Sequence, residues 1–324
     1  MIPGPRRPDV RFTARFLLVT LAFGLPALAT AGSEAADMDM SPTTYVVGFV
    51  VLGWLLFGAY EVLAWGTTAL LGRMVGPAES RAERQARARR PTVFTPFRAL
   101  LVLVTYIAGT GVAAWGLVLL VEALGGKVES GTLATGRYSW IILASLVLGA
   151  AAAWGAFRGF ARPRDRVRMR RLRRSPGARI VRATVLGAMV FALFVSFVLP
   201  FLLPISESYE PGTVSRMAAA AGWPRLWLAA IAVLVAPPVE ETLFRGVLLE
   251  GLLRRISRFD AILLTTLLFG VGHLPDILGN WPAVTAILGG GWILAELRLR
   301  TRSLVPGVAA HMAYNGVLMA LTLL

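Results

Sequence analysis

The sequence predicts an all-α protein that crosses the lipid bilayer as a bundle of about eight or nine transmembrane helices. Three observations support this fold class: 56% of the 324 residues are hydrophobic, the mean hydropathy is +0.67, and long apolar runs recur along the whole chain. The core of a soluble protein of this length does not need so many long apolar runs. Lipid is therefore the expected solvent for most of the chain.

Nine apolar runs have the length of a membrane helix or come close to it. Prolines end the fifth run and interrupt the sixth, and the seventh and eighth runs are short. The predicted spans cover residues 16–31, 44–71, 99–124, 139–160, 181–203, 225–253, 260–274, 281–297 and 303–324.

The distribution of basic residues predicts the orientation of these spans. Of the 33 lysines and arginines, 28 fall in segments on the same side as the N-terminus and four on the opposite side. The positive-inside rule therefore places the N-terminus in the cytoplasm. An integral protein of a bacterial cytoplasmic membrane is expected, since nearly all basic residues are arginine and the chain is rich in alanine and glycine, as in GC-rich genomes. Alternatively, the first run is a signal peptide cleaved near residues 29–31.

Composition also limits the chemistry and the partners. The chain has no cysteine, which excludes disulfides, thiolate metal sites and a cysteine nucleophile. Its net charge of +15 comes from short linkers between apolar runs, so no nucleic-acid partner is expected. The densest basic segment, residues 162–179, is interpreted as a loop against anionic lipid headgroups. The expected partner is the bilayer itself.

Acidic residues in the sixth run suggest a reactive carboxylate. Glu241 and Arg245 are four residues apart and can form an ion pair on one helix face, which leaves Glu240 free. Pro237 and Pro238 favour a local helix start. Both glutamates are then expected in the first turn of a half-helix, near its positive end.

Both histidines of the chain, His273 and His311, lie inside apolar runs, where ionisable side chains are costly and indicate function. A rise of about 1.5 Å per residue from the arginines at the cytoplasmic ends places Glu240, His273 and Asn315 roughly 20–22 Å deep and His311 about 14 Å deep. In a hydrocarbon core about 30 Å thick, these four residues share one central layer.

The same residues suit peptide-bond hydrolysis. Glu240 and His273 could hold and deprotonate one water molecule, which would attack an amide carbonyl. His311 and Asn315 are four residues apart and could donate hydrogen bonds to one oxygen, as an oxyanion hole requires.

Three motifs together resemble one family. They are EETLFR at 240–245, FGVGH at 269–273 and HMAYN at 311–315. The resemblance is to the CPBP family, the CAAX-protease and bacteriocin-processing (Abi-like) group of intramembrane glutamic endopeptidases, and it covers about residues 225–324. We therefore expect an N-terminal transmembrane region at 1–203 with arginine-rich cytoplasmic loops, and a catalytic transmembrane core at 204–324.

The resemblance implies a role for each matched residue. Its substrate would be a peptide or protein, with or without a lipid modification, and no cofactor would be needed. The implied roles are general base for Glu240 with assistance from His273, oxyanion stabilisation for His311 and Asn315, and a structural ion pair for Glu241 and Arg245. Phe269 is expected to pack beside His273.

Three alternatives remain at this stage. Glu240, His273 and His311 would make a two-histidine, one-carboxylate zinc set and hence a metalloendopeptidase, although the usual helical zinc signature is missing. An ion-coupled transporter also needs intramembrane carboxylates and histidines, but it should show two broken spans. A non-catalytic immunity protein could bind a peptide in the same cavity.

Overall fold

The computed structural model describes residues 95–128, 136–161, 163–207, 209–220 and 222–322, without the side chains of 163–165 and Pro275. The predicted spans at 16–31 and 44–71 lie outside the described residues. Within them, secondary structure is helical throughout apart from one isolated bridge between Ile205 and Asn280. This confirms the all-α class. The helices belong to one compact unit, which comprises residues 71–205 and 210–324.

Four helical stretches in the described part of the chain are long and apolar enough to cross a membrane. Their outer surfaces carry large exposed hydrophobic side chains, such as Trp115 and Val190, which suit contact with lipid. A shorter apolar helix follows at the C-terminal end, and the count of eight or nine spans stays a prediction. The four stretches are α4 (Pro96–Ala123), α5 (Trp140–Phe160), α7 (Ala178–Phe197) and the continuous run Trp223–Leu252.

The remaining helices are shorter or carry buried charges. Local signals set several of their ends: the Ser257 side chain caps the helix that begins at Arg258, and the Asn280 side chain caps the helix that begins at Trp281. They are α6 (Pro163–Leu172), α8 (Leu199–Leu202), α9 (Thr213–Ala219), α13 (Arg258–Val271), α14 (Leu274–Ile277), α15 (Trp281–Thr301) and α16 (Val305–Leu321).

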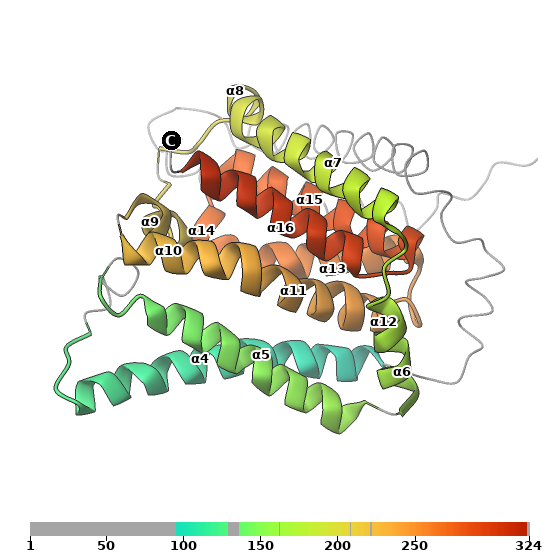
Figure 1. Cartoon of the computed structure of the whole chain (residues 1–324), viewed down its shortest axis with the longest axis horizontal. Helices are drawn as coiled ribbons and strands as arrows, with labels where there is room; N and C mark the ends of the chain where they lie inside the picture. The colour runs from blue at the N-terminus through green and yellow to red at the C-terminus, as the bar shows by residue number, and fades with distance from the viewer. Residues whose placement is uncertain (1–94, 129–135, 162, 208, 221, 323–324) are drawn as a thin grey trace, which may run out of the picture. The chain divides into compact units, whose positions relative to one another are not determined.

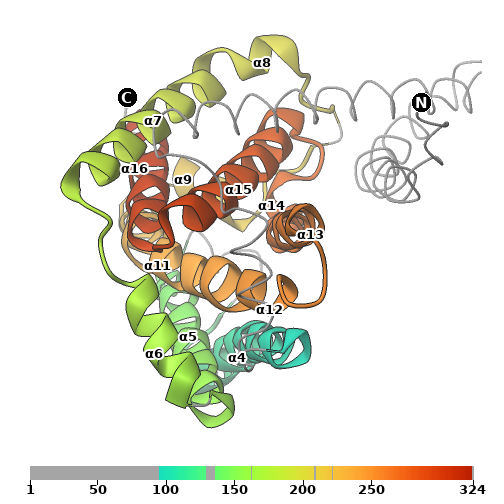
Figure 2. The same cartoon turned by 90° about the vertical axis from the view of Figure 1, so that its right-hand side faces the viewer.

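Helices that are far apart in the sequence pack in pairs. α7 lies along α16, and α13 lies along α15 (Figures 1 and 2). α4 packs against α5 so closely that a Cβ atom at Gly149 would lie 2.0 Å from Thr110 Oγ1. Small residues allow such backbone approach between helices in lipid.

Two buried glutamates tie the arginine-rich end of the unit together. Glu250 accepts hydrogen bonds from Arg168 of α6 and from Arg298 of α15, and Glu296 pairs with Arg258 and Arg300. Partial burial lowers the pKa of the Arg168 guanidinium below its usual value. Buried charges need such partners, so these pairs hold α6, α12 (Leu249–Leu252), α13 and α15 in register.

The run from Trp223 to Leu252 corrects the predicted half-helix. It stays helical through Pro237 and Pro238, as the successive segments α10 (Trp223–Ala229), η3 (Ala230–Val235), α11 (Ala236–Glu240), η4 (Glu241–Leu248) and α12. The segments η3 and η4 are π-helical, with wider turns than an α-helix. The wider turn before the prolines absorbs the ring clash and the missing N–H groups that would otherwise break the helix. The glutamates therefore lie inside a continuous helix and not at a helix start.

Candidate active site

The Glu241–Arg245 ion pair is the most deeply buried part of the site. Arg245 Nη1 lies 3.0 Å from Glu241 Oε1, and both side chains are at most 1% exposed. Arg245 also donates from Nη2 to the carbonyl oxygen of Gly291 at 3.1 Å, which joins η4 to α15. The spacing of four residues predicts this pair, and the second contact makes it a tertiary link.

His311 connects the two neighbouring glutamates. Its Nδ1 lies 3.2 Å from Glu241 Oε1, and its Nε2 lies 3.8 Å from Glu240 Oε2. An ionised carboxylate only accepts hydrogen bonds, so the contact with Glu241 assigns a proton to Nδ1. Glu241 therefore fixes the plane of the imidazole and turns its other nitrogen toward Glu240.

Glu240 differs from Glu241 in its surroundings. The Glu240 side chain is 16% exposed, whereas that of Glu241 is 1% exposed. Its separation of 3.8 Å from His311 exceeds hydrogen-bonding distance, so the contact is electrostatic. α4 packs against η4, so a helix from outside the region of the three motifs lies close to the site. Glu240 is thus the more accessible of the two carboxylates.

Phe269 of α13 packs against both histidines and against Arg245. Its ring centroid lies 4.6 Å from that of His273 and 6.1 Å from that of His311. The Arg245 guanidinium carbon lies 4.4 Å from the same ring, within the range of a cation–π contact. The aromatic ring therefore lies beside both histidines and the buried ion pair.

His273 lies just beyond the end of α13 and not inside a helix, which corrects the predicted span of 260–274. Its Nδ1 is 2.8 Å from the carbonyl oxygen of Phe269. A carbonyl accepts, so Nδ1 carries the proton and Nε2 is left as an acceptor. This tautomer suits a ring that takes a hydrogen bond from water.

Asn315 is held by a hydrogen bond to a backbone carbonyl that a proline leaves without a helical donor. A π-helical bond to the Ala232 carbonyl oxygen would come from the nitrogen of residue 237, but Pro237 has no N–H group. The Asn315 side-chain nitrogen donates to this oxygen instead, at 2.6 Å. One of the two amide N–H groups is thus engaged, and the other remains available.

The structure brings most of the predicted residues into direct contact. His311 contacts both Glu240 and Glu241, and Arg245 contacts Glu241. His273 joins through Phe269, whereas Asn315 shares the helix of His311 but bonds to Ala232. The structure therefore gives His311 and Asn315 separate partners, and their predicted shared oxygen stays a prediction. The sequence motifs do not indicate a role for Gly307.

Two glycines leave space for the buried side chains of Glu241 and Arg245. A Cβ atom at Gly307 would lie 3.3 Å from Glu241 Oε2, and one at Gly291 would lie 3.4 Å from Arg245 Nη2. Gly307 precedes His311 by four residues and therefore shares its helix face. That spacing is the sequence signal that could have identified it.

The alternative zinc set is not assembled in this structure. Among the described residues, no group of three or more histidine, aspartate or glutamate side chains is placed to hold a metal ion. The Nδ1 contacts of His311 with Glu241 and of His273 with a backbone carbonyl are not the reason, because metal-bound histidines usually make such a contact with their other ring nitrogen.

The fold and the site together define a class: an all-α membrane protein with a buried carboxylate–imidazole cluster. Residues 221–317 match the family described as Type II CAAX prenyl endopeptidase Rce1-like. This match confirms the resemblance carried by the three motifs over residues 221–317, and it suggests a CAAX-type membrane protease. No match was found among curated proteins or among solved structures.

Proposed function

We propose that the chain is an intramembrane endopeptidase that hydrolyses a peptide bond within or near the bilayer. The observation that carries this proposal is the contact of His311 with both Glu240 and Glu241, at 3.8 and 3.2 Å. An accessible carboxylate beside an oriented imidazole is the arrangement that general acid–base chemistry requires. The similarity of residues 221–317 to CAAX prenyl endopeptidases supports the same reaction class.

In the proposed mechanism, Glu240 takes a proton from a water molecule. His273 would accept a hydrogen bond from this water at Nε2, because its Nδ1 proton is engaged by the Phe269 carbonyl. The resulting hydroxide attacks the scissile carbonyl carbon, and the carbonyl π electrons move to the oxygen. Glu240 then returns the proton to the leaving amine as the C–N bond breaks.

His311 and Asn315 would stabilise the negative oxygen of the tetrahedral intermediate. Asn315 has a second side-chain N–H beyond the one that bonds to Ala232. A His311 ring with both protons would donate from Nδ1 to Glu241 and from Nε2 toward the reacting oxygen, and the flanking carboxylates would balance its charge. Such preorganised donors contribute strongly in a site that excludes water.

The location and substrate follow from the same proposal. The protein would lie in a bacterial cytoplasmic membrane with its N-terminus inside, as the arginine distribution indicates. Its substrate would be a peptide or protein that reaches the bilayer. A lipid-modified substrate is a hypothesis that the name of the matched family supports.

The proposal is tested by comparing membrane peptides from cells that produce the wild type with those from cells that produce Glu240→Gln. We expect a set of cleavage products that is absent with Glu240→Gln but present with Glu122→Gln, a matched change on the exposed surface of α4. Identical peptide patterns for wild type and Glu240→Gln, at equal amounts of folded protein, would contradict the proposal.

A further inference from the structure

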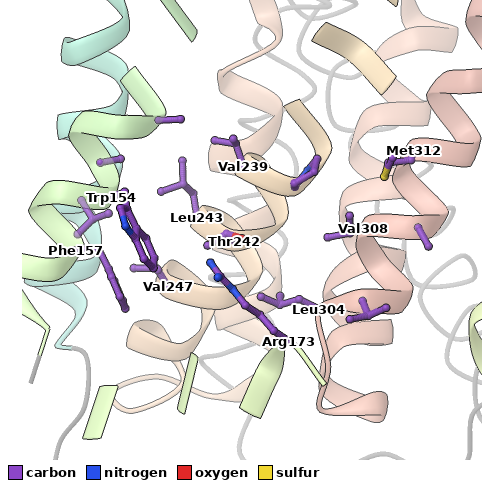
Figure 3. Close-up of a pocket in the computed structure, with 16 residues that line it drawn as sticks. Trp154, Phe157, Arg173, Val239, Thr242, Leu243, Val247, Leu304, Val308 and Met312 are labelled. Carbon is purple, nitrogen blue, oxygen red and sulfur yellow. The ribbon is translucent and has the colours of Figure 1, made fainter. Parts of the chain in front are cut away.

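A cavity of about 480 Å³ lies apart from the candidate active site (Figure 3). Its walls come from α4 and α5, from α11 and η4, and from α16. Ligand-binding cavities usually span about 300–1,000 Å³, so one small molecule or one lipid chain fits. None of the seven candidate site residues lines it.

The walls of the cavity are apolar except at one end. Trp154 and Phe157 of α5 face Val308 and Met312 of α16 across the space, and Arg173 is the one charged residue among those that line it. Arg173 follows the end of α6 and is exposed. A ligand that matches this environment needs a hydrocarbon part and one anionic end.

Two arginines contact the ring of Trp154, which lines the cavity. The guanidinium carbon of Arg173 lies 5.3 Å from the Trp154 ring centroid, and that of Arg158 lies 5.5 Å from the same ring. Within the described part of the chain, neither has a carboxylate partner, whereas Arg168 in the same basic segment is paired with Glu250. Guanidinium groups held on an aromatic ring are well placed to bind phosphate.

We propose that this cavity binds one acyl chain of an anionic phospholipid, with its phosphate between Arg158 and Arg173. The occupant follows from charge complementarity: both cations contact Trp154 in the cavity wall, and the lining is largely apolar and large enough for one acyl chain. Basic pockets between membrane helices bind anionic headgroups in the same way.

A lipid chain bound in this cavity would pack against the helices that carry the candidate active-site residues. Val239 and Thr242 line the cavity and flank the two glutamates in sequence, and Met312 follows His311. A bound acyl chain therefore packs against both helices that carry these site residues. The lipid site is defined by its own residues and does not depend on the proposed peptidase reaction.

The test is a binding measurement on the full-length protein in neutral detergent. Native mass spectrometry would count bound dioleoyl phosphatidylglycerol and, separately, dioleoyl phosphatidylcholine. We expect one tightly bound phosphatidylglycerol and a preference for it that the double variant Arg158→Gln/Arg173→Gln lowers by about tenfold or more. Because only binding is measured, the result is independent of peptide cleavage.

Two controls separate this site from other sources of binding. Arg170→Gln changes the charge of the same basic segment without touching the cavity and should keep the preference for phosphatidylglycerol. Ala150→Phe adds a ring at the cavity wall and should reduce the binding of both lipids. Size-exclusion profiles that match the wild type would verify that each variant is folded.

Three outcomes would overturn the proposal. Equal binding of the two lipids, or equal loss of the preference with Arg170→Gln, would indicate diffuse attraction to the basic surface. Full lipid binding by Ala150→Phe would place the lipid elsewhere. Displacement of phosphatidylglycerol by a prenylated peptide at equal concentration would make the cavity a substrate site.

Discussion

Loss of the Arg245 side chain should lower the free energy of unfolding by about 3–5 kcal/mol, because Glu241 would stay buried without its counter-charge. The two side chains are at most 1% exposed and lie 3.0 Å apart. Arg245 also bonds to the Gly291 carbonyl at 3.1 Å and stacks 4.4 Å from the Phe269 ring. One substitution therefore removes contacts of η4 with both α13 and α15.

Two variants separate the effect of the unpaired Glu241 charge on stability from the effect of the other contacts of Arg245. Arg245→Met keeps most of the side-chain length but leaves the Glu241 carboxylate unpaired. Adding Glu241→Gln removes both charges, and replacing a buried ion pair as a whole is often close to neutral for stability. The double variant should therefore recover most of the lost stability in reversible detergent unfolding. Peptide cleavage should not recover, because His311 loses the carboxylate that orients its Nδ1.

This reasoning fails if Arg245→Met unfolds at the same detergent composition as the wild type. It also fails if the double variant is less stable than Arg245→Met, because the penalty would then not come from an unpaired buried charge. Full cleavage by a folded double variant would refute the orienting role of Glu241.

Three further predictions address other parts of the structure. His273→Gln should lower the cleavage rate by about 100-fold or more while the unfolding midpoint stays that of the wild type, since the attacking water loses the Nε2 acceptor that positions it; unchanged cleavage would remove His273 from the mechanism. Asn315→Ala should cost about 1–3 kcal/mol of stability, because the Ala232 carbonyl loses its donor, and an unchanged midpoint would contradict this role. Gly149→Ala should destabilise the α4–α5 pair by about 1–3 kcal/mol, whereas Gly155→Ala on the same helix meets no atom within 4 Å and should be neutral; equal midpoints would show that the close approach has no energetic role.

The sequence was informative where a signal is local. The apolar run 225–253 predicts the helical stretch Trp223–Leu252 to within two residues at each end, and 139–160 predicts α5. The spacing of Glu241 and Arg245 predicts an ion pair that is present. The three motifs predict the family, because their order and spacing are more specific than any one of them. The division of the chain at residue 203 stays a prediction.

Features that depend on tertiary contacts could not be predicted. The π-helical segment η3 comes directly before the two prolines, and a distant amide, Asn315, takes up the freed carbonyl of Ala232. Hydropathy extends the seventh span through His273, whereas the helix ends at Val271. No local sequence signal indicates that Glu296 pairs with Arg258, 38 residues away. Such pairs depend on which helices become neighbours.

The central claim is that Glu240 deprotonates the attacking water. Its most direct test is the single-turnover cleavage of one identified substrate peptide by wild type and Glu240→Gln, each reconstituted in liposomes and verified as folded. We predict that the rate constant falls by at least about 100-fold in Glu240→Gln, since the amide cannot accept the proton. A rate within about threefold of the wild type would contradict the account, because a difference that small corresponds to less than 1 kcal/mol in the barrier.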